Sequence, residues 1–249
     1  MKSASAETAR EARLIARAAR KGALATNRRA ARSSTKGGVG SQPYVSKVGV
    51  ATDVSGAPLF LFSTLAAHTQ DLLADPRASL LLEAPSAAEN PLEGARCTLV
   101  GRVKKLTGIE SDAARAVYLT RHPSAARYAG FGDFALWRMN IDKVHYVGGF
   151  GRAKWVKGVE YGSEAVGLAD AHARILEHLN GPGRDDLRAV GAYVTGRSGR
   201  GLKALSLDAD GLAVIGSKGA QVRVDFSSPA RDARGWRARF AALLRRARA

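Results

Sequence analysis

The sequence predicts an α+β fold in which an antiparallel β-barrel precedes a second, smaller C-terminal α+β domain. Residues 20–157 contain roughly six strand-like runs joined by turns and short helices, without the regular strand–helix alternation of a parallel sheet. The pattern changes near 157–165, and helices dominate after it. Because 45% of the 249 residues are hydrophobic, the chain can bury a substantial core. We expect a basic helix at 1–21, the barrel at 22–158 and the tail domain at 163–249.

The barrel part begins with one helix and continues with strands. Ser5 suits an N-cap, Glu7 favours the positive end of the helix, and Gly22 can end it after Lys21. Pro76 ends a second helix, because the residue before a proline disfavours α geometry. The expected strands are 22–26, 44–53, 55–64, 77–84, 95–106 and 133–151, and the short helices are 68–74 and 109–122.

The tail part contains more helix. Helices are expected at about 163–180 and 185–194, followed by a hairpin at Asp210-Gly211 and a strand at 221–226. A final helix is expected after a cap at Ser227 or Ser228, with Pro229 near its first turn. Its apolar residues recur at helical spacing, at Trp236, Phe240, Leu243 and Leu244.

The net charge of +17 is concentrated at the two ends of the chain. Residues 1–40 hold ten Lys and Arg against two acidic residues, and residues 227–249 hold seven against one, which leaves +3 for the remainder. A basic amphipathic helix is most often a solvated face, and the same charge predicts weak polyanion binding through the termini. No DNA-binding or RNA-binding motif accompanies the charge.

Several functional classes are excluded by what the sequence lacks. The longest apolar runs, at 59–62 and 80–82, are far shorter than the roughly 20 residues of a membrane span, and we expect a cytoplasmic protein. A single cysteine, Cys97, excludes a disulfide framework and a Cys-based zinc site. No phosphate-binding P-loop or complete dinucleotide-binding glycine motif occurs. His172 and His178 are six residues apart and do not share a helix face, so no metal site is predicted.

Polar residues gather in FSTLAAHTQDLLADPRASLLLE (62–83), where a strand passes into a helix. Ser63 and Thr64 end the strand, and His68 and Thr69 begin the helix. Hydroxyls and helix-initial N–H groups would meet there, which suits a phosphate. The same residue types are also ordinary helix caps. From spacing alone, capping without a ligand is slightly favoured.

Longer segments carry a family resemblance. PYVSKVGVATDVSGAPLFLFSTLAAHTQDLLADPRASLLL, LVGRVKKL and RYAGFGDFALWRMNIDKVHYVGGFGRAKWV resemble the pyridoxamine 5′-phosphate oxidase-like FMN-binding split-barrel family. With the appended tail, they look most like its haem-utilisation branch, over about 20–157 and 163–245. The resemblance implies a split β-barrel of the FMN-binding type and a homodimer with the flavin site at the subunit interface.

The resemblance also implies a cofactor site. Ser63, Thr64, His68 and Thr69 match the turn that holds the FMN phosphate, with His68 where the oxidases have a lysine. A neutral imidazole brings no charge to a phosphate. The missing cation must therefore come from another part of the chain.

Two further pairs of residues match cofactor positions of the family. Ser46 and Lys47 match a position where the oxidases use an arginine, and strand alternation allows only one of them to point inward. Trp137 and Arg138 match an aromatic–basic pair that can approach the flavin from the other subunit. Lys47 or Arg138 is therefore the expected source of the missing cation.

In haem-degrading members, a histidine after the barrel ligates iron with an acidic partner, and His172 with Asp133 is the matching candidate pair. The tail departs from the family pattern H-M-N-x-D-H-x-D-A-L. Its segment HLNGPGRDDL keeps His178, Asn180 and Asp186 but lacks the second histidine. If that histidine serves a metal or haem in relatives, this chain lacks it.

Three functions follow as hypotheses. The leading one is an FMN-linked oxidoreductase of unknown substrate. The second is a haem-binding or haem-degrading protein with the same fold, and the third is a non-catalytic binding module that uses its basic ends. The sequence identifies neither the catalytic residues nor the substrate.

Overall fold

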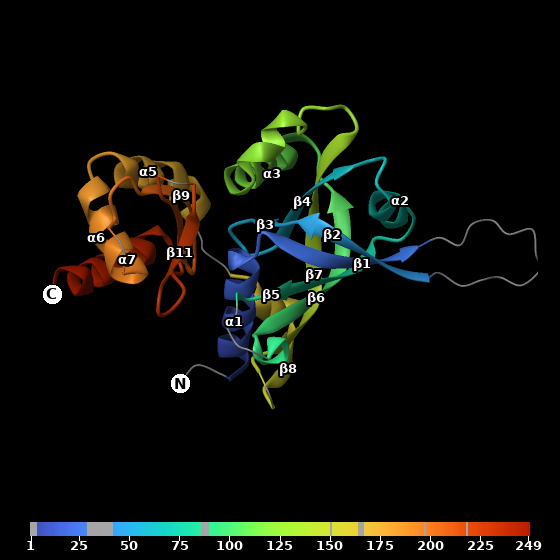
Figure 1. Cartoon of the computed structure of the whole chain (residues 1–249), viewed down its shortest axis with the longest axis horizontal. Helices are drawn as coiled ribbons and strands as arrows, with labels where there is room; N and C mark the ends of the chain where they lie inside the picture. Colours follow the sequence, from blue (N-terminus) through green and yellow to red (C-terminus); the bar gives the residue numbers. More distant parts are fainter. Residues whose placement is uncertain are drawn as a thin grey trace, which may run out of the picture. The chain divides into compact units, whose positions relative to one another are not determined.

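The computed structural model describes residues 4–28, 42–85, 90–149, 151–163, 167–196, 198–217 and 219–249. The chain divides into two compact units, Met1–Gly162 and Ser163–Ala249 (Figure 1). Each unit has a hydrophobic core of its own. In the described ranges, every helix is too short or too polar to cross a lipid bilayer.

The strands of the first unit form one antiparallel sheet. They are β1 (Lys21–Arg28), β2 (Gln42–Gly49), β3 (Ala51–Thr52), β4 (Pro58–Ser63), β5 (Arg77–Glu83), β6 (Arg96–Lys105), β7 (Phe134–Val147) and β8 (Ala153–Lys157). Their order is β2-β1-β5-β6-β7-β4-β3, with β8 paired to β7 (Figure 1). This confirms the predicted α+β class with an antiparallel barrel-type sheet.

The expected strand over 44–53 is two strands in the structure. β2 ends at Gly49, and the N–H of Val50 donates to the carbonyl of Arg20 (3.0 Å) before β3 begins. β3 then pairs with β4, whereas β2 pairs with β1. The break therefore lets one chain segment serve both ends of the sheet.

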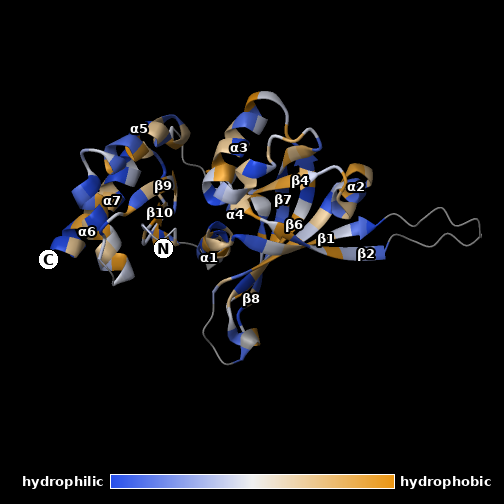
Figure 2. Ribbon diagram, turned by 45° about the horizontal axis from the view of Figure 1, so that its top comes forward, coloured by the Kyte–Doolittle hydropathy of each residue, from blue (hydrophilic) through white to orange (hydrophobic). Residues whose placement is uncertain are grey.

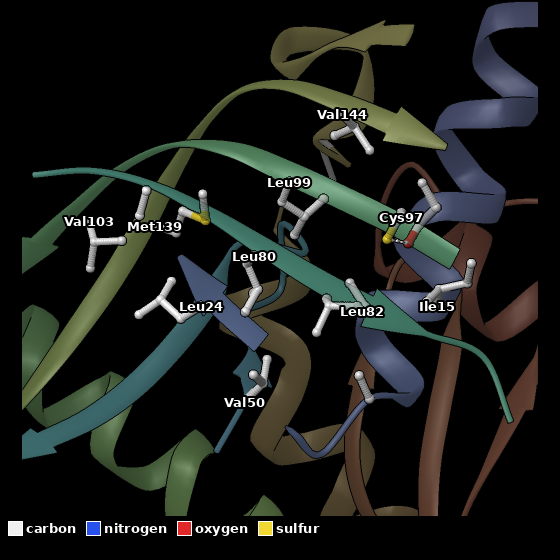
Figure 3. Packing of buried hydrophobic residues seen from close by; sticks show 14 of the residues in the cluster. Ile15, Leu24, Val50, Leu80, Leu82, Cys97, Leu99, Val103, Met139 and Val144 are labelled. Atoms are coloured by element: carbon white, nitrogen blue, oxygen red, sulfur yellow. Dashed lines mark hydrogen bonds between the residues drawn. The ribbon is translucent and has the colours of Figure 1, made fainter. Parts of the chain in front are cut away.

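The helices of the first unit are α1 (Ala4–Ala18), α2 (Ala67–Ala74), α3 (Gly108–Arg121) and α4 (Gly158–Tyr161). α1 packs on the sheet through Ala12 and Ile15, in a core that also contains Leu82, Cys97 and Leu99 (Figure 3). A short 3₁₀ helix at Pro123–Arg127 follows α3.

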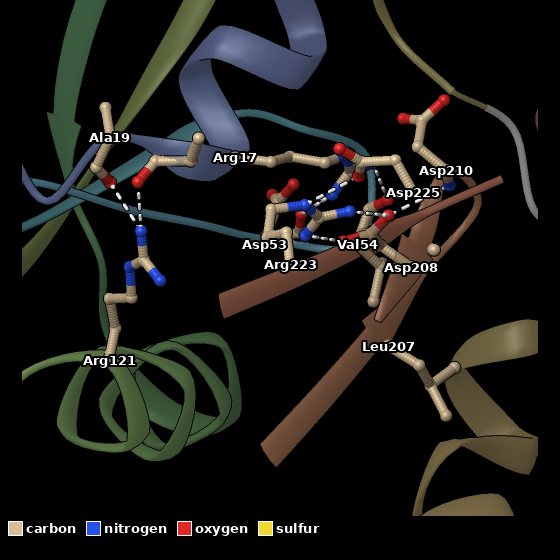
Figure 4. A network of polar contacts seen from close by, with 12 residues as sticks. Arg17, Ala19, Asp53, Val54, Arg121, Leu207, Asp208, Asp210, Arg223 and Asp225 are labelled. Carbon is tan, nitrogen blue, oxygen red and sulfur yellow. Dashed lines mark hydrogen bonds and ion pairs between the residues drawn. The ribbon is translucent and has the colours of Figure 1, made fainter. Parts of the chain in front are cut away.

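The N-terminal helix is not simply a solvated basic face, in contrast to the expectation from its composition. Arg13 and Arg17 are each 4% exposed. Arg13 donates to the carbonyl of Tyr161 (2.5 Å), and Arg17 donates to those of Asp53 (3.2 Å) and Val54 (3.0 Å; Figure 4). The guanidinium groups can be buried because backbone oxygens replace water as their partners.

The second unit combines helices with a small antiparallel sheet. Its elements are α5 (Leu168–Asn180), α6 (Arg184–Thr195), β9 (Lys203–Asp208), β10 (Gly211–Ile215), β11 (Gln221–Asp225) and α7 (Ala233–Arg248). The sheet order is β11-β10-β9, and Asp208 faces Gly211 across the expected hairpin. Arg223 on β11 forms a buried ion pair with Asp208 on β9 (2.7 Å; Figure 4).

Two boundaries in this unit differ from the expectation. The helix expected at 163–180 begins at Leu168, after Gly167 adopts a left-handed backbone (φ 67°). The final helix is capped by Asp232, whose carboxylate accepts from the N–H of Gly235 (2.6 Å), so the expected cap at Ser227 or Ser228 is wrong. A carboxylate at this position also interacts favourably with the positive end of the helix.

Candidate functional site

An open cleft of about 600 Å³ lies in the first unit. Its walls come from β2, β4, the start of β1 and the segment from α3 to β7. β2 ends at Gly49, where a Cβ atom would lie 2.5 Å from the hydroxyl oxygen of Tyr118. The glycine therefore lets the Tyr118 side chain approach the strand and form part of the wall.

Basic and aromatic residues line this cleft. Among the residues that the structure describes, Arg20, Lys21 and Lys47 are the basic lining residues other than histidine. Lys47, and not Ser46, is among the lining residues, as strand alternation requires for one of the pair. Burial raises the pKa of Tyr118 to about 12, so its phenol keeps its proton at neutral pH.

His122 is one of two histidines in the cleft, and its ring is held in one orientation. Its Nε2 lies 2.9 Å from the carbonyl oxygen of Val50, and the ring packs against Tyr118 with centroids 4.7 Å apart. Because a carbonyl only accepts hydrogen bonds, Nε2 carries the proton and Nδ1 keeps its lone pair. Burial lowers the pKa of His122, and although the Val50 carbonyl opposes this, the neighbouring Arg20 and Arg121 add to the lowering. The imidazole is therefore neutral at pH 7.

His68 is the second histidine of the cleft. Its ring meets Phe62 edge-on, with centroids 4.5 Å apart. Burial lowers the pKa of His68, although the carboxylate of Asp71 partly opposes this. Asp71 is itself 5% exposed and accepts a hydrogen bond from Thr26 (2.9 Å). His68 is therefore also neutral at pH 7.

The predicted phosphate turn lies at one edge of the cleft, but its hydroxyls do not cap the helix. Ser63 donates to the carboxylate of Asp133 (2.5 Å) and accepts from the N–H of Leu65 (3.1 Å). The N–H of Thr64 donates to the carbonyl of Asp133 (2.8 Å). The N-cap residue of α2 is Ala66, and no side chain of the described ranges caps this helix. The capping interpretation is therefore wrong for Ser63, which instead ties the turn to the start of β7.

Thr69 differs from the other residues of the turn because it is fully buried. Among the described residues, its hydroxyl has no hydrogen-bond partner. A buried hydroxyl without a partner costs free energy, so such a group in a native site needs an explanation. Thr69 lies in the first turn of α2 but is not among the residues that line the cleft, and its contact with a phosphate stays a prediction.

Trp137 and Arg138 lie outside this cleft. Trp137 is 3% exposed, and its ring centroid lies 6.2 Å from that of Phe62, so it belongs to the core of its own chain. Arg138 lies 3.8 Å from Asp53 and lines a separate cavity of about 210 Å³. The approach of Trp137 and Arg138 to a flavin from the other subunit therefore stays a prediction.

The expected haem-ligand pair has local partners within each unit. Asp133 holds Ser63 in the first unit. His172 lies on α5 in the second unit, where its Nε2 accepts from the N–H of Leu207 (3.3 Å). Burial lowers the pKa of His172, opposed by Asp208. This hydrogen bond uses the lone pair that Nε2 would offer to iron, and the pairing of His172 with Asp133 stays a prediction.

Five basic and aromatic residues that line the cleft are missing from the site residues predicted from the sequence. Two segments that are far apart in the chain supply them: Arg20 and Lys21 come from one, and Tyr118, His122 and Tyr128 come from the other. No short motif connects them. The sequence locates the end of the helix at His122, because Pro123 follows it, but it does not place that side chain in the cleft.

The comparisons with known proteins agree with this fold. A family model described as CREG, beta-barrel, matches residues 3–163. A chloroplastic haem oxygenase of an unconventional type, HOZ from Arabidopsis thaliana, is 32% identical over 200 residues, which cover 76% of this chain and 60% of the relative. The chain thus spans about 60% of the length of that curated relative.

Two solved structures match nearly the whole chain. A haem-binding protein from Mycobacterium smegmatis is 30% identical, with a TM-score of 0.56, and the match covers 100% of this chain and 99% of that one. A protein of unknown function from Agrobacterium tumefaciens is 26% identical, with a TM-score of 0.74, over 96% of this chain and 95% of that one. Both units of this chain therefore have structural counterparts.

Proposed function

We infer the function from one premise: this chain belongs to the CREG β-barrel family, whose fold is a split barrel. We propose that it binds haem in the cleft of the first unit and acts as a haem-binding or haem-degrading protein. One observation carries the proposal: two neutral histidines, aromatic walls and three other basic residues meet in a single cleft of about 600 Å³. The haem-related names of two similar proteins support it.

The donor set of the cleft matches the chemistry of haem. Iron binds a neutral imidazole nitrogen, and the free Nδ1 of His122 is such a group. The Val50 carbonyl orients that ring from the other side, as outer-shell partners orient metal-bound histidines. Arg20, Lys21 and Lys47 can pair with the carboxylates of the propionate groups.

The protein's own contribution is binding, orientation and protonation state. Bound haem would supply the iron and oxygen chemistry. His122 would hold the iron through a ring whose orientation is fixed by Val50, and His68 would face the cofactor from beside Phe62. The protonated phenol of Tyr118 would serve as a hydrogen-bond donor in the same cleft.

FMN is a second candidate, favoured by a different observation. The N-terminus of α2 has no side-chain cap, and the hydroxyl of Thr69 beside it is buried without a partner among the described residues. Helix-initial N–H groups and a free hydroxyl suit a phosphate. Lys47 lines the same cleft as Ala66 and His68 and would supply the cation that His68 lacks. An FMN-linked oxidoreductase therefore stays a prediction beside haem binding.

A titration of the purified protein with haemin tests the first proposal. We expect a Soret band on binding and a loss of at least about tenfold in affinity for His122→Ala, because one iron ligand is removed. His145→Ala is the matched control: His145 stacks on Trp155 (4.7 Å) and is not a lining residue of the cleft. An unchanged Soret band and affinity in both His122→Ala and His68→Ala would show that haem does not bind here.

The same titration with FMN tests the second candidate. Flavin fluorescence should be quenched on binding, and Thr69→Val should weaken FMN binding while leaving haemin binding unchanged. Wild-type protein that takes up no FMN would remove this candidate.

We also propose a homodimer with the cleft near its subunit interface. Leu65 is 85% exposed and Phe131 is 61% exposed, and each is a large apolar side chain. They lie in neighbouring segments, since the N–H of Thr64 donates to the carbonyl of Asp133. Exposed apolar side chains that gather beside a site often mark a protein interface.

A further inference from the structure

The second unit contains a cavity of its own, which the proposed haem or FMN function does not use. It has a volume of about 390 Å³ and is lined by residues of α5, α6 and α7. This volume lies within the range of small-molecule binding sites, which are mostly apolar with a few well-placed polar groups. The buried residues at the base of the cavity, its floor, and the exposed residues at its opening, its rim, determine which ligand it can bind.

The floor of the cavity is apolar and firmly packed. Ile175, Leu179, Trp236 and Phe240 line it and are all buried. The rings of Trp236 and Phe240 stack with centroids 5.5 Å apart. The indole N–H of Trp236 already donates to the carbonyl of Gly211 (3.3 Å). The floor thus offers apolar surface, and a ligand does not have to accept a hydrogen bond from the indole N–H.

The rim of the cavity is basic. Arg174 on α5 and Arg237 on α7 are exposed lining residues, each next in sequence to a floor residue. Within the described ranges, neither guanidinium forms a hydrogen bond or an ion pair. The carboxylate at the rim, Asp186, is paired with Arg248 (2.6 Å), which neutralises its charge. Two uncompensated positive charges therefore face solvent above the apolar floor.

We propose that this cavity binds a small amphipathic carboxylate, with the apolar body on the floor and the carboxylate between Arg174 and Arg237. Arginine is suited to this role because its planar guanidinium matches a carboxylate in two parallel hydrogen bonds. A neutral apolar molecule would leave both arginines without a partner. A polyanion chain would gain nothing from the apolar floor, so the two features together select a carboxylate with an apolar body.

The residues of the tail segment that match the family pattern fall into two groups, one structural and one that lines the cavity. Asn180 has a structural role, because its side chain exchanges two hydrogen bonds with the backbone of Ala204 (2.9 and 2.8 Å). His178 and Asp186, in contrast, line the cavity. Part of the retained pattern therefore positions β9 against α5, and the rest surrounds the proposed ligand site.

Calorimetric titration of the full chain with decanoate tests the proposal, with acetate and decanol as matched probes. Decanoate should bind at least about tenfold more tightly than either, because acetate lacks the apolar body and decanol lacks the charge. In NMR spectra, the indole N–H signal of Trp236 should shift on decanoate binding, while those of Trp137 and Trp155 in the first unit should not. Absence of decanoate binding, or equal binding of decanol, would overturn the proposal.

Variants locate the site. The double variant Arg174→Gln with Arg237→Gln should lose at least about tenfold in decanoate affinity. Arg234→Gln with Arg245→Gln, at exposed α7 positions that do not line the cavity, should bind like the wild type. Leu244→Trp should abolish binding by filling the cavity, with helix content unchanged in circular dichroism. Equal affinity of the two double variants would place decanoate elsewhere and overturn the assignment.

Discussion

His122 illustrates how the function of one residue depends on partners that the sequence does not reveal. The lone pair on Nδ1 is available because the carbonyl of Val50, 72 residues away in sequence, accepts a hydrogen bond from the N–H at Nε2. Lys47, Ser63 and His68 could be predicted because they fall in segments that resemble a known family. His122 and Arg20 could not, because only the folded sheet brings them to the same cleft.

The protonation of these histidines gives a pH dependence with a definite sign. Burial lowers the pKa of His68 and of His122 below the ordinary value of 6.5. Well above pH 6.5 both rings are neutral whether the chain is folded or unfolded. As the pH falls below 6.5, the unfolded chain takes up protons first, so the folded state loses stability until the pH has passed the lowered pKa values.

Haemin affinity should follow the protonation of the folded protein. We expect constant affinity above pH 6.5 and a decline as the pH passes through the lowered pKa values, since a protonated imidazole has no lone pair for iron. The measurement is the haemin dissociation constant as a function of pH, by Soret absorbance. His145→Ala should give the wild-type profile. An affinity that rises on acidification would contradict the assignment of neutral imidazoles to the cleft.

At the scale of elements, α1 shows why composition can mislead. Its arginines suggested a solvated face, but Arg13 and Arg17 lie on the side that meets the barrel and satisfy backbone carbonyls there. Helical periodicity could place both arginines on one face of α1. It could not show that backbone carbonyls of other segments lie against that face. The α7 cap has a similar origin: Ser227, Ser228 and Asp232 are all good capping residues, and only the backbone path selects Asp232.

The burial of Arg17 predicts a large effect of its removal. Arg17→Ala should lower the free energy of unfolding of the first unit by about 2–4 kcal/mol, because two carbonyl groups lose a charged donor and a cavity is left. Urea denaturation followed by circular dichroism measures this change. Arg102→Ala is the control: Arg102 is exposed on β6, and its loss should change stability by less than about 0.5 kcal/mol. Equal stabilities of the two variants would mean that α1 does not depend on these bonds.

At the scale of the whole molecule, the basic ends of the chain are parts of the two cores. α1 contributes Ala12 and Ile15 to the first core, and α7 contributes Trp236 and Phe240 to the second. Figure 2 shows hydrophobic and hydrophilic residues mixed along α7. Polyanion binding through the termini stays a prediction, and removing either helix would not test it because a core would be lost. Substituting exposed arginines such as Arg246 avoids that problem.

The proposed homodimer gives the last prediction, because it links the exposed apolar residues to the assembly. Sedimentation of the wild type should give the mass of two chains, and Leu65→Glu with Phe131→Glu should give the mass of one, since charged side chains would have to be buried in the interface. The control is Ile109→Glu with Val159→Glu. These residues are 86% and 88% exposed, so the control adds the same charge to equally exposed apolar positions away from the 63–69 turn.

Haemin titration of these variants then tests whether the partner subunit contributes to the haem site. None of these four residues lines the cleft, so haemin affinity per chain should stay unchanged in the control. A monomeric variant that binds haemin as tightly as the dimer would place the whole site within one chain. A loss in that variant alone would mean that the partner subunit completes the cleft. A wild type that sediments as one chain, or a dimer that survives Leu65→Glu with Phe131→Glu, would contradict the proposed interface.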